Sequence, residues 1–195
     1  MQCIKGGILA GIVLFLWYLF SWMVLPWHST TLNMFKDEQA VADVIVANVP
    51  QSGIYILPLS QMQGGQATQA TQTANQTDQT TATTNQTQTA SMPMVFASVY
   101  TPGMPSMIGS MSIALVVQII AAILVGWMLL QTSGLNYFMR LGFVLVFALT
   151  AGIITEGSYW NWFAFDSMYT GVMIADLLIG WLFAGLILAK ICVKK

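Results

Sequence analysis

The sequence predicts an all-α membrane protein: a four-transmembrane-helix bundle with a small extracytoplasmic cap between the first and second spans. The cap is predicted to contain one helix and a β-hairpin. Four long apolar runs, separated by polar stretches, are the first observation behind this fold class. The second is composition: 56% of the 195 residues are hydrophobic and 7% are charged, against about 25% charged residues in soluble domains. The net charge of −1 and the lack of a basic patch exclude a nucleic-acid partner.

The first predicted span covers residues 1–25, in which an apolar run of about 20 residues begins at Gly6. Lys5 precedes the run, as it would in a signal peptide. However, the run exceeds the roughly 7–15 apolar residues of a signal core, and no A-x-A-like cleavage site follows. We therefore expect a retained membrane helix. Trp22 and Trp27 are expected to mark its outer interface, because indole rings prefer the headgroup region.

The predicted cap extends over residues 26–109. Asn33 is a candidate N-cap for an amphipathic helix over Leu32–Asn48, which Pro50 and Gly53 would end.

Two short apolar segments, Gly53–Pro58 and Met94–Tyr100, favour strands that pair as the hairpin. Residues 61–91 between them consist almost entirely of Gln, Thr, Ala and Asn. This composition cannot bury a core, so we predict a disordered, low-complexity periplasmic loop.

The remaining spans are predicted at residues 110–130, at residues 140–156 and within residues 169–195, where the chain ends in a basic tail. Residues 157–168 join the third span to the fourth and are rich in aromatic side chains. We expect this link to lie at headgroup depth rather than inside a span.

Basic residues indicate the orientation of the chain. If both termini are cytoplasmic, five of the six basic residues lie inside, namely Lys5, Arg140, Lys190, Lys194 and Lys195. We therefore predict a multi-pass cell-membrane protein with both termini cytoplasmic, and favour the bacterial inner membrane from the compact topology and the lack of targeting signals.

The two cysteines, Cys3 and Cys192, both fall on the predicted cytoplasmic side. Neither belongs to a C-x-x-C or His/Cys metal pattern. Because the cytoplasm is reducing, we expect no disulfide and no redox pair.

Three polar residues of the last three spans lie at similar depth. At 1.5 Å per residue, Gln118, Glu156 and Asp176 stand roughly 20, 24 and 21 Å above the inner surface of a core about 30 Å thick. Each lies above a stripe of small residues four positions apart: Ala122 and Gly126, Gly152 and Ala148, and Gly180 and Ala184. Since helices approach closely at such stripes, we expect an intramembrane polar layer that points into the bundle.

The polar layer has a structural and a functional interpretation. In the first, Gln118 and a protonated carboxyl group hydrogen-bond across helices and set their register. In the second, Glu156 and Asp176 form a pocket for protons, a metal cation or a cationic substrate. A third arrangement leaves Glu156 and Asp166 solvated at the surface and Asp176 alone.

His28, the one histidine, and Asp166 are accessory polar candidates. His28 could join Glu156, Asp166 or Asp43 in a mixed metal site, but an interfacial hydrogen-bonding histidine is favoured. The sequence contains no G-x-S-x-G, H-E-x-x-H or P-loop motif. We therefore predict no catalytic residues, no metal and no cofactor.

These features favour a non-enzymatic interaction, assembly or accessory protein of a membrane complex. Its expected partners are the lipid bilayer and either another membrane protein or a second copy. The alternative is a small proton- or cation-linked transporter or channel-like protein that uses Glu156 and Asp176. A wet cavity along the polar layer would favour transport, whereas a closed, dry layer would favour assembly.

Overall fold

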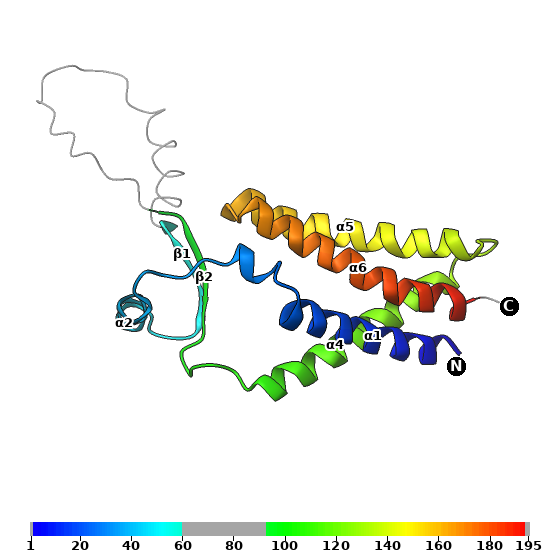
Figure 1. Ribbon diagram of the computed structural model, residues 1–195, viewed down its shortest axis with the longest axis horizontal. Helices are drawn as coiled ribbons and strands as arrows, with labels where there is room; N and C mark the ends of the chain where they lie inside the picture. Colours follow the sequence, from blue (N-terminus) through cyan, green and yellow to red (C-terminus); the bar gives the residue numbers. More distant parts are fainter. Residues whose placement is uncertain (1, 60–92, 194–195) are drawn as a thin grey trace, which may run out of the picture. The chain divides into compact units, whose positions relative to one another are not determined.

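The computed structural model describes residues 2–59 and 93–193, and it is mostly helical (Figure 1). Within these residues four helices are long and apolar enough to cross a membrane, which indicates a multi-pass membrane protein. They are α1 (Gln2–Val24), α4 (Met107–Leu130), α5 (Tyr137–Phe163) and α6 (Ser167–Ile191). The predicted disordered loop, residues 61–91, lies outside the described residues.

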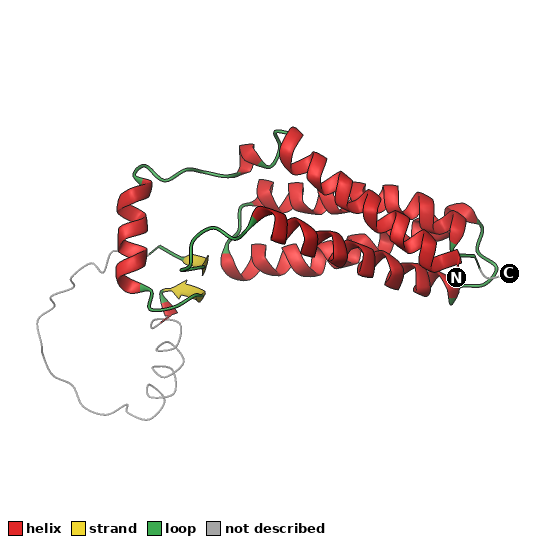
Figure 2. Cartoon of the chain, turned by 90° about the horizontal axis from the view of Figure 1, so that it is seen from below, coloured by secondary structure: helices red, strands yellow, loops and turns green. Residues whose placement is uncertain are grey.

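The chain divides into two units. The bundle unit contains residues 1–38 and 104–195, and the second unit contains residues 39–103. Figure 2 shows the four long helices of the bundle unit side by side, with the two ends of the chain at one end of the bundle.

Helix α1 packs along α4 and α6, and α5 packs along α6, whereas α4 and α5 make at most marginal contact in the described residues. The α1–α4 contact depends on Gly7 and Gly11. A Cβ atom at Gly11 would lie 2.4 Å from the Cα atom of Ile119, and one at Gly7 would lie 2.8 Å from that of Ile123. The two backbones therefore approach as closely as a G-x-x-x-G sequence permits.

Small residues also occupy the faces of α4, α5 and α6 that are turned inward. All six members of the predicted stripes are buried: Ala122, Gly126, Ala148, Gly152, Gly180 and Ala184. Leu14, Leu129, Val144 and Leu188 fill the core beside them. The periodicity of small residues thus identified the packed faces of these helices correctly.

The third span differs from its prediction, because α5 continues through Gly157 to Phe163 and absorbs most of the expected aromatic link. Ser158 lies within the helix, and its hydroxyl donates to the carbonyl oxygen of Ile154 one turn earlier at 2.5 Å. The helix ends where Ala164 adopts a left-handed conformation with φ 54°. The amides of Ala164 and Phe165 both donate to the carbonyl of Tyr159, as at many helix C-termini.

The second unit contains α2 (Glu38–Asn48) and a two-stranded sheet. Strands β1 (Gly53–Leu57) and β2 (Val95–Val99) pair in antiparallel register, with Tyr55 opposite Ala97, which confirms the predicted hairpin.

The predicted start of α2 was wrong. Residues 32–37 are not helical, and a 3₁₀ turn, η1 (Ser29–Thr31), precedes them. Asn33 is therefore not an N-cap. The apolar residues at Leu32 and Phe35 had suggested helical spacing, but both side chains are exposed and no packing supports a helix there.

The expectation of free cysteines is also contradicted. Cys3, in the first turn of α1, is bonded to Cys192, the residue that follows α6. The prediction had placed both residues at one end of the bundle, where the structure has them. We expected no disulfide because the cytoplasm is reducing, and the predicted positions of the two cysteines were compatible with one.

Candidate functional site

The polar side chains buried deepest in the bundle gather where α6 meets α1 and the turn after α1. Asp176 of α6 is 1% exposed, Ser21 of α1 is fully buried, and His28 of the turn is 2% exposed. With Trp17 and Trp27 they form what we call the Asp176 centre.

A glycine one turn along α6 makes room for the first contact of this centre. A Cβ atom at Gly180 would lie 2.9 Å from Cδ1 of Trp17, so a larger residue would push the indole ring away. In its observed position, the Trp17 Nε1–H donates to Oδ1 of Asp176 at 2.7 Å and to the backbone carbonyl oxygen of Asp176 at 3.1 Å. The short distance to Oδ1 is typical of a charge-assisted hydrogen bond.

The turn after α1 brings His28 back towards α6. Helix α1 ends at Val24, just before Pro26, and the amide of Thr30 donates to the Pro26 carbonyl oxygen at 3.0 Å. The imidazole ring of His28 stacks on Trp22 with a centroid distance of 4.0 Å and an interplanar angle of 8°. These contacts hold the ring at a fixed place beside Asp176.

One nitrogen of His28 meets two oxygen atoms. Nε2 lies 3.3 Å from Oδ2 of Asp176 and 3.0 Å from Oγ of Ser21. The Ser21 oxygen also accepts a hydrogen bond from Trp27 Nε1 at 2.9 Å. Nδ1 of His28 is buried without a hydrogen-bond partner in the described structure.

These contacts limit which protonation states of Asp176 and His28 can occur together. An ionised Asp176 requires a hydrogen on Nε2 of His28, because otherwise two lone pairs would face each other across 3.3 Å. That hydrogen then lies between Oδ2 of Asp176 and Oγ of Ser21. A charged His28 makes the contact an ion pair, and a neutral His28 protonated at Nε2 makes it a hydrogen bond.

The combination of Ser, His and Asp does not form a catalytic triad. In a triad the carboxylate and the serine contact different ring nitrogens, so that the histidine can pass a proton between them. Here both approach Nε2, and the Ser21 hydroxyl is fully buried. The geometry therefore suits a structural polar centre and does not prepare a nucleophile.

The structure does not join the other members of the predicted polar layer to Asp176. Gln118 and Glu156 are each partly exposed on α4 and α5, and within the described residues neither side chain has a hydrogen bond or an ion pair. Asp166 is exposed and caps α6, where its Oδ1 accepts from the amides of Met168 and Tyr169 at 2.8 and 2.9 Å.

Among the described residues of the bundle, side chains suited to a metal ion do not converge. His28 lies beside Asp176 and, among the described residues of the bundle unit, is not grouped with Glu156 or Asp166, while Asp43 belongs to the second unit. No group of three or more His, Cys, Asp or Glu side chains that could hold a metal ion occurs in the part of the chain that the structure describes.

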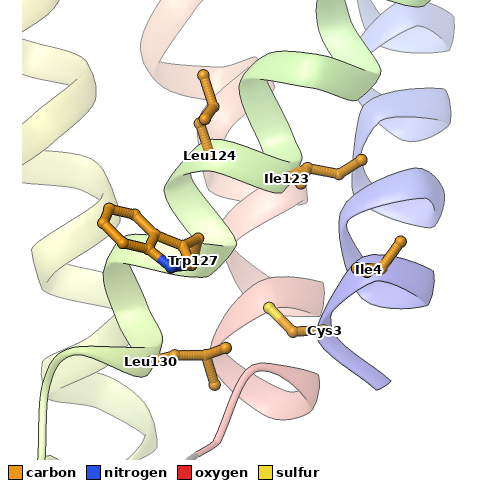
Figure 3. A pocket seen from close by; sticks show the side chains of 6 residues that line it. All are labelled: Cys3, Ile4, Ile123, Leu124, Trp127 and Leu130. Atoms are coloured by element: carbon orange, nitrogen blue, oxygen red, sulfur yellow. The ribbon is translucent and has the colours of Figure 1, made fainter. Parts of the chain in front are cut away.

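Three clefts of the bundle, of about 510, 350 and 330 Å³, are separate from the Asp176 centre. The largest lies between α1 and α4 (Figure 3). It is lined by Cys3, Ile4, Ile123, Leu124, Trp127 and Leu130. Asp176 lines none of the three, and their walls are apolar side chains of the kind that face lipid.

Sequence reasoning singled out both Asp176 and His28 but did not pair them. Trp17 was not singled out, and Trp22 and Trp27 were assigned to a membrane interface. One available signal was the i, i+4 spacing of Trp17 and Ser21, which places both on one face of α1.

Comparison with models of protein families, with curated proteins and with solved structures finds no match to this chain.

Proposed function

We propose that this chain is a non-enzymatic membrane protein of interaction, assembly or accessory type, with both termini cytoplasmic and residence in the bacterial inner membrane. The observation that carries the proposal is the closed state of the Asp176 centre. Asp176 is 1% exposed, and Trp17 and His28 of the same chain occupy the space around its carboxyl oxygens. A centre closed by side chains of the same chain favours assembly over passage of a substrate.

The transporter alternative receives less support from the geometry. It requires Glu156 and Asp176 to act on one path, whereas Asp176 faces α1 and no hydrogen bond or ion pair among the described residues links it to Glu156. A carboxylate that carries ions must also exchange its partners for water or a cation, and the partners here are fixed by packing.

The second unit supports a role in protein association. A cleft of about 270 Å³ lies between α2 and the hairpin, lined mostly by apolar side chains that include Val44, Ile45, Tyr55 and Leu57. Val44 is 63% exposed, and Val46, on the same helix, is 78% exposed. Exposed apolar side chains gathered on one small unit are typical of interaction surfaces.

The orientation is supported by charge. Among the described residues of the bundle unit, Lys5, Arg140 and Lys190 belong to the helix ends near the chain termini, while Lys36 comes after the other end of α1 in the chain. The positive-inside rule assigns the terminal end to the cytoplasm.

Native purification in a mild detergent tests the assembly role. We expect the chain to be recovered with a membrane-protein partner in a fixed stoichiometry, measured by mass spectrometry of the intact complex. Recovery as a homo-oligomer alone would contradict the accessory role.

Ion flux into vesicles tests the alternative. Vesicles containing the purified chain and a pH-sensitive dye are expected to take up protons no faster than empty vesicles. A flux that is present in the wild type and lost in both Glu156→Gln and Asp176→Asn would replace the assembly proposal with transport.

A further inference from the structure

The Cys3–Cys192 disulfide lies at the end of the bundle that carries the basic residues. It joins the first turn of α1 to the residue after α6, and Gly126 of α4 packs against it. A Cβ atom at Gly126 would lie 3.0 Å from each sulfur atom. The bond therefore packs against α4, with Cys192 buried and Cys3 partly exposed.

Two physical rules disagree about this end of the molecule. The positive-inside rule assigns it to the cytoplasm, because Lys5 and Lys190 lie within two residues of the bonded cysteines. The cytoplasm keeps thiols reduced, and the disulfides that form there are mostly transient, as in catalytic or redox-sensing sites. Both rules hold if the bond is reversible.

We propose that Cys3 and Cys192 are a reversible thiol–disulfide exchange site whose co-reactants are a low-molecular-weight thiol and its disulfide. The proposal rests on the cytoplasmic orientation given above and is independent of the assembly role. In the oxidised state the first and last helices are tied together at their ends, and in the reduced state they are held by packing alone.

Burial determines which sulfur reacts. Cys192 is fully buried, whereas Cys3 is partly exposed and lines the cleft shown in Figure 3, beside Trp127 and Leu130. Of the two bonded residues only Cys3 has exposed surface, so we infer that an incoming thiolate attacks Cys3 and that Cys192 is the leaving sulfur. This asymmetry is what exchange requires, since one sulfur is attacked and the other leaves.

The reaction balances as two exchanges. A thiolate forms a bond to the Cys3 sulfur, the Cys3–Cys192 bond breaks, and Cys192 leaves with the electron pair and takes up a proton. A second small thiolate then attacks the sulfur atom of the small molecule in the mixed disulfide. This step releases the small disulfide, and the Cys3 sulfur leaves with the electron pair and takes up a proton. Oxidation is the reverse, with the small disulfide accepting the two electrons.

The thiol state in living cells tests the proposal. Cells are quenched in acid, free thiols are alkylated with a polyethylene-glycol maleimide, and the chain is resolved on a non-reducing gel. We expect the doubly modified form to predominate in unstressed cells and the unmodified form after brief treatment with diamide. The modified form should return when diamide is removed. Cys3→Ser and Cys192→Ser mark the position of the singly modified band.

Three outcomes would overturn reversibility. A bond that stays closed in unstressed cells is a permanent structural disulfide, and thiols that stay free after diamide do not form the bond in cells. A bond that forms with diamide but does not reopen when diamide is removed is not reversible.

Orientation is tested separately with Cys192→Ser, in which Cys3 is the single thiol of the chain. A membrane-impermeant maleimide is expected to label Cys3 in inverted vesicles and not in intact spheroplasts. Labelling of intact spheroplasts, or labelling from neither side, would contradict exchange at a cytoplasmic Cys3. Partner recovery in the native purification is read independently, so a failure of this proposal is distinguishable from a failure of the assembly role.

Discussion

The contact between His28 and Asp176 makes the sharpest prediction about stability. When both groups are ionised, two unit charges 3.3 Å apart attract by about 5 kcal/mol at an effective dielectric constant of about 20. Desolvation of both groups offsets much of this attraction, so the intact pair adds little net stability. Loss of His28 is different, because the Asp176 charge then stays buried without an opposite charge and keeps only the hydrogen bonds from Trp17 among the described side chains.

A double-mutant cycle separates these two effects. His28→Phe keeps an aromatic ring against Trp22 but removes the nitrogen that faces Asp176. We expect it to lower the free energy of unfolding by about 3–5 kcal/mol, the usual cost of an orphaned buried charge. Asp176→Asn removes the charge and retains an acceptor for Trp17, so we expect a cost of about 1–3 kcal/mol.

The double variant should lose less free energy of unfolding than the two single variants together, by about 2 kcal/mol or more. The reason is that the Asp176→Asn substitution removes the charge, so the additional loss of His28 leaves no buried charge unpaired. Reversible unfolding in mixed micelles, followed by tryptophan fluorescence, measures all four free energies. Asp166→Asn is the matched control: it removes an exposed carboxylate and should leave the free energy of unfolding nearly unchanged. Costs that add to within about 0.5 kcal/mol would refute an energetic link between His28 and Asp176.

Three further predictions follow from the packing, and all are read as free energies of unfolding in the same micelles. Gly11→Ala should cost about 1–3 kcal/mol or more, because its Cβ atom would meet the α4 backbone at 2.4 Å, whereas Gly142→Ala, with nothing within 4 Å, should be neutral or stabilising by up to about 1 kcal/mol. Equal effects of the two would contradict the close α1–α4 contact. Asp166→Ala should cost about 0.5–2 kcal/mol through loss of the α6 N-cap, and an unchanged stability would show that the cap contributes nothing. Gln118→Leu and Glu156→Gln should each change stability by less than about 0.5 kcal/mol and leave partner recovery intact, since both side chains are partly exposed; a larger loss in either would reinstate the three-helix polar layer.

The membrane helices and the hairpin were predictable because their signals are local. An apolar run of about 20 residues leaves few alternatives to a spanning helix, and short apolar segments bounded by turn residues indicate strands. The pairing of the two strands was inferred because the polar tract between them offers no other strand. Small residues four positions apart identified the inward faces for the same reason, because residues at this spacing lie on one face of a helix.

The partners of Asp176 were not predictable from spacing alone. Counting residues gives the depth of a side chain, but the helix that it faces depends on how each helix is rotated against its neighbours. Glu156 and Asp176 share a depth, yet Asp176 faces α1, and Trp17 fills the space beside it. His28 reaches Asp176 through a turn after Pro26, and no periodic pattern describes the path of such a turn.

The contacts of α1 with α6 explain why this pair stands at the centre of the bundle. In lipid the hydrophobic effect gives helices little reason to associate, so close packing and interhelical polar contacts decide which pairs are stable. Helices α1 and α6 have both: Gly180 admits Trp17, and Asp176 accepts its hydrogen bond. At the opposite end the Cys3–Cys192 bond fixes the same two helices. Helices α4 and α5 pack on either side of this pair: α4 lies against Gly7 and Gly11 of α1, and the Tyr137 hydroxyl of α5 donates to the Leu186 carbonyl oxygen of α6 at 3.3 Å.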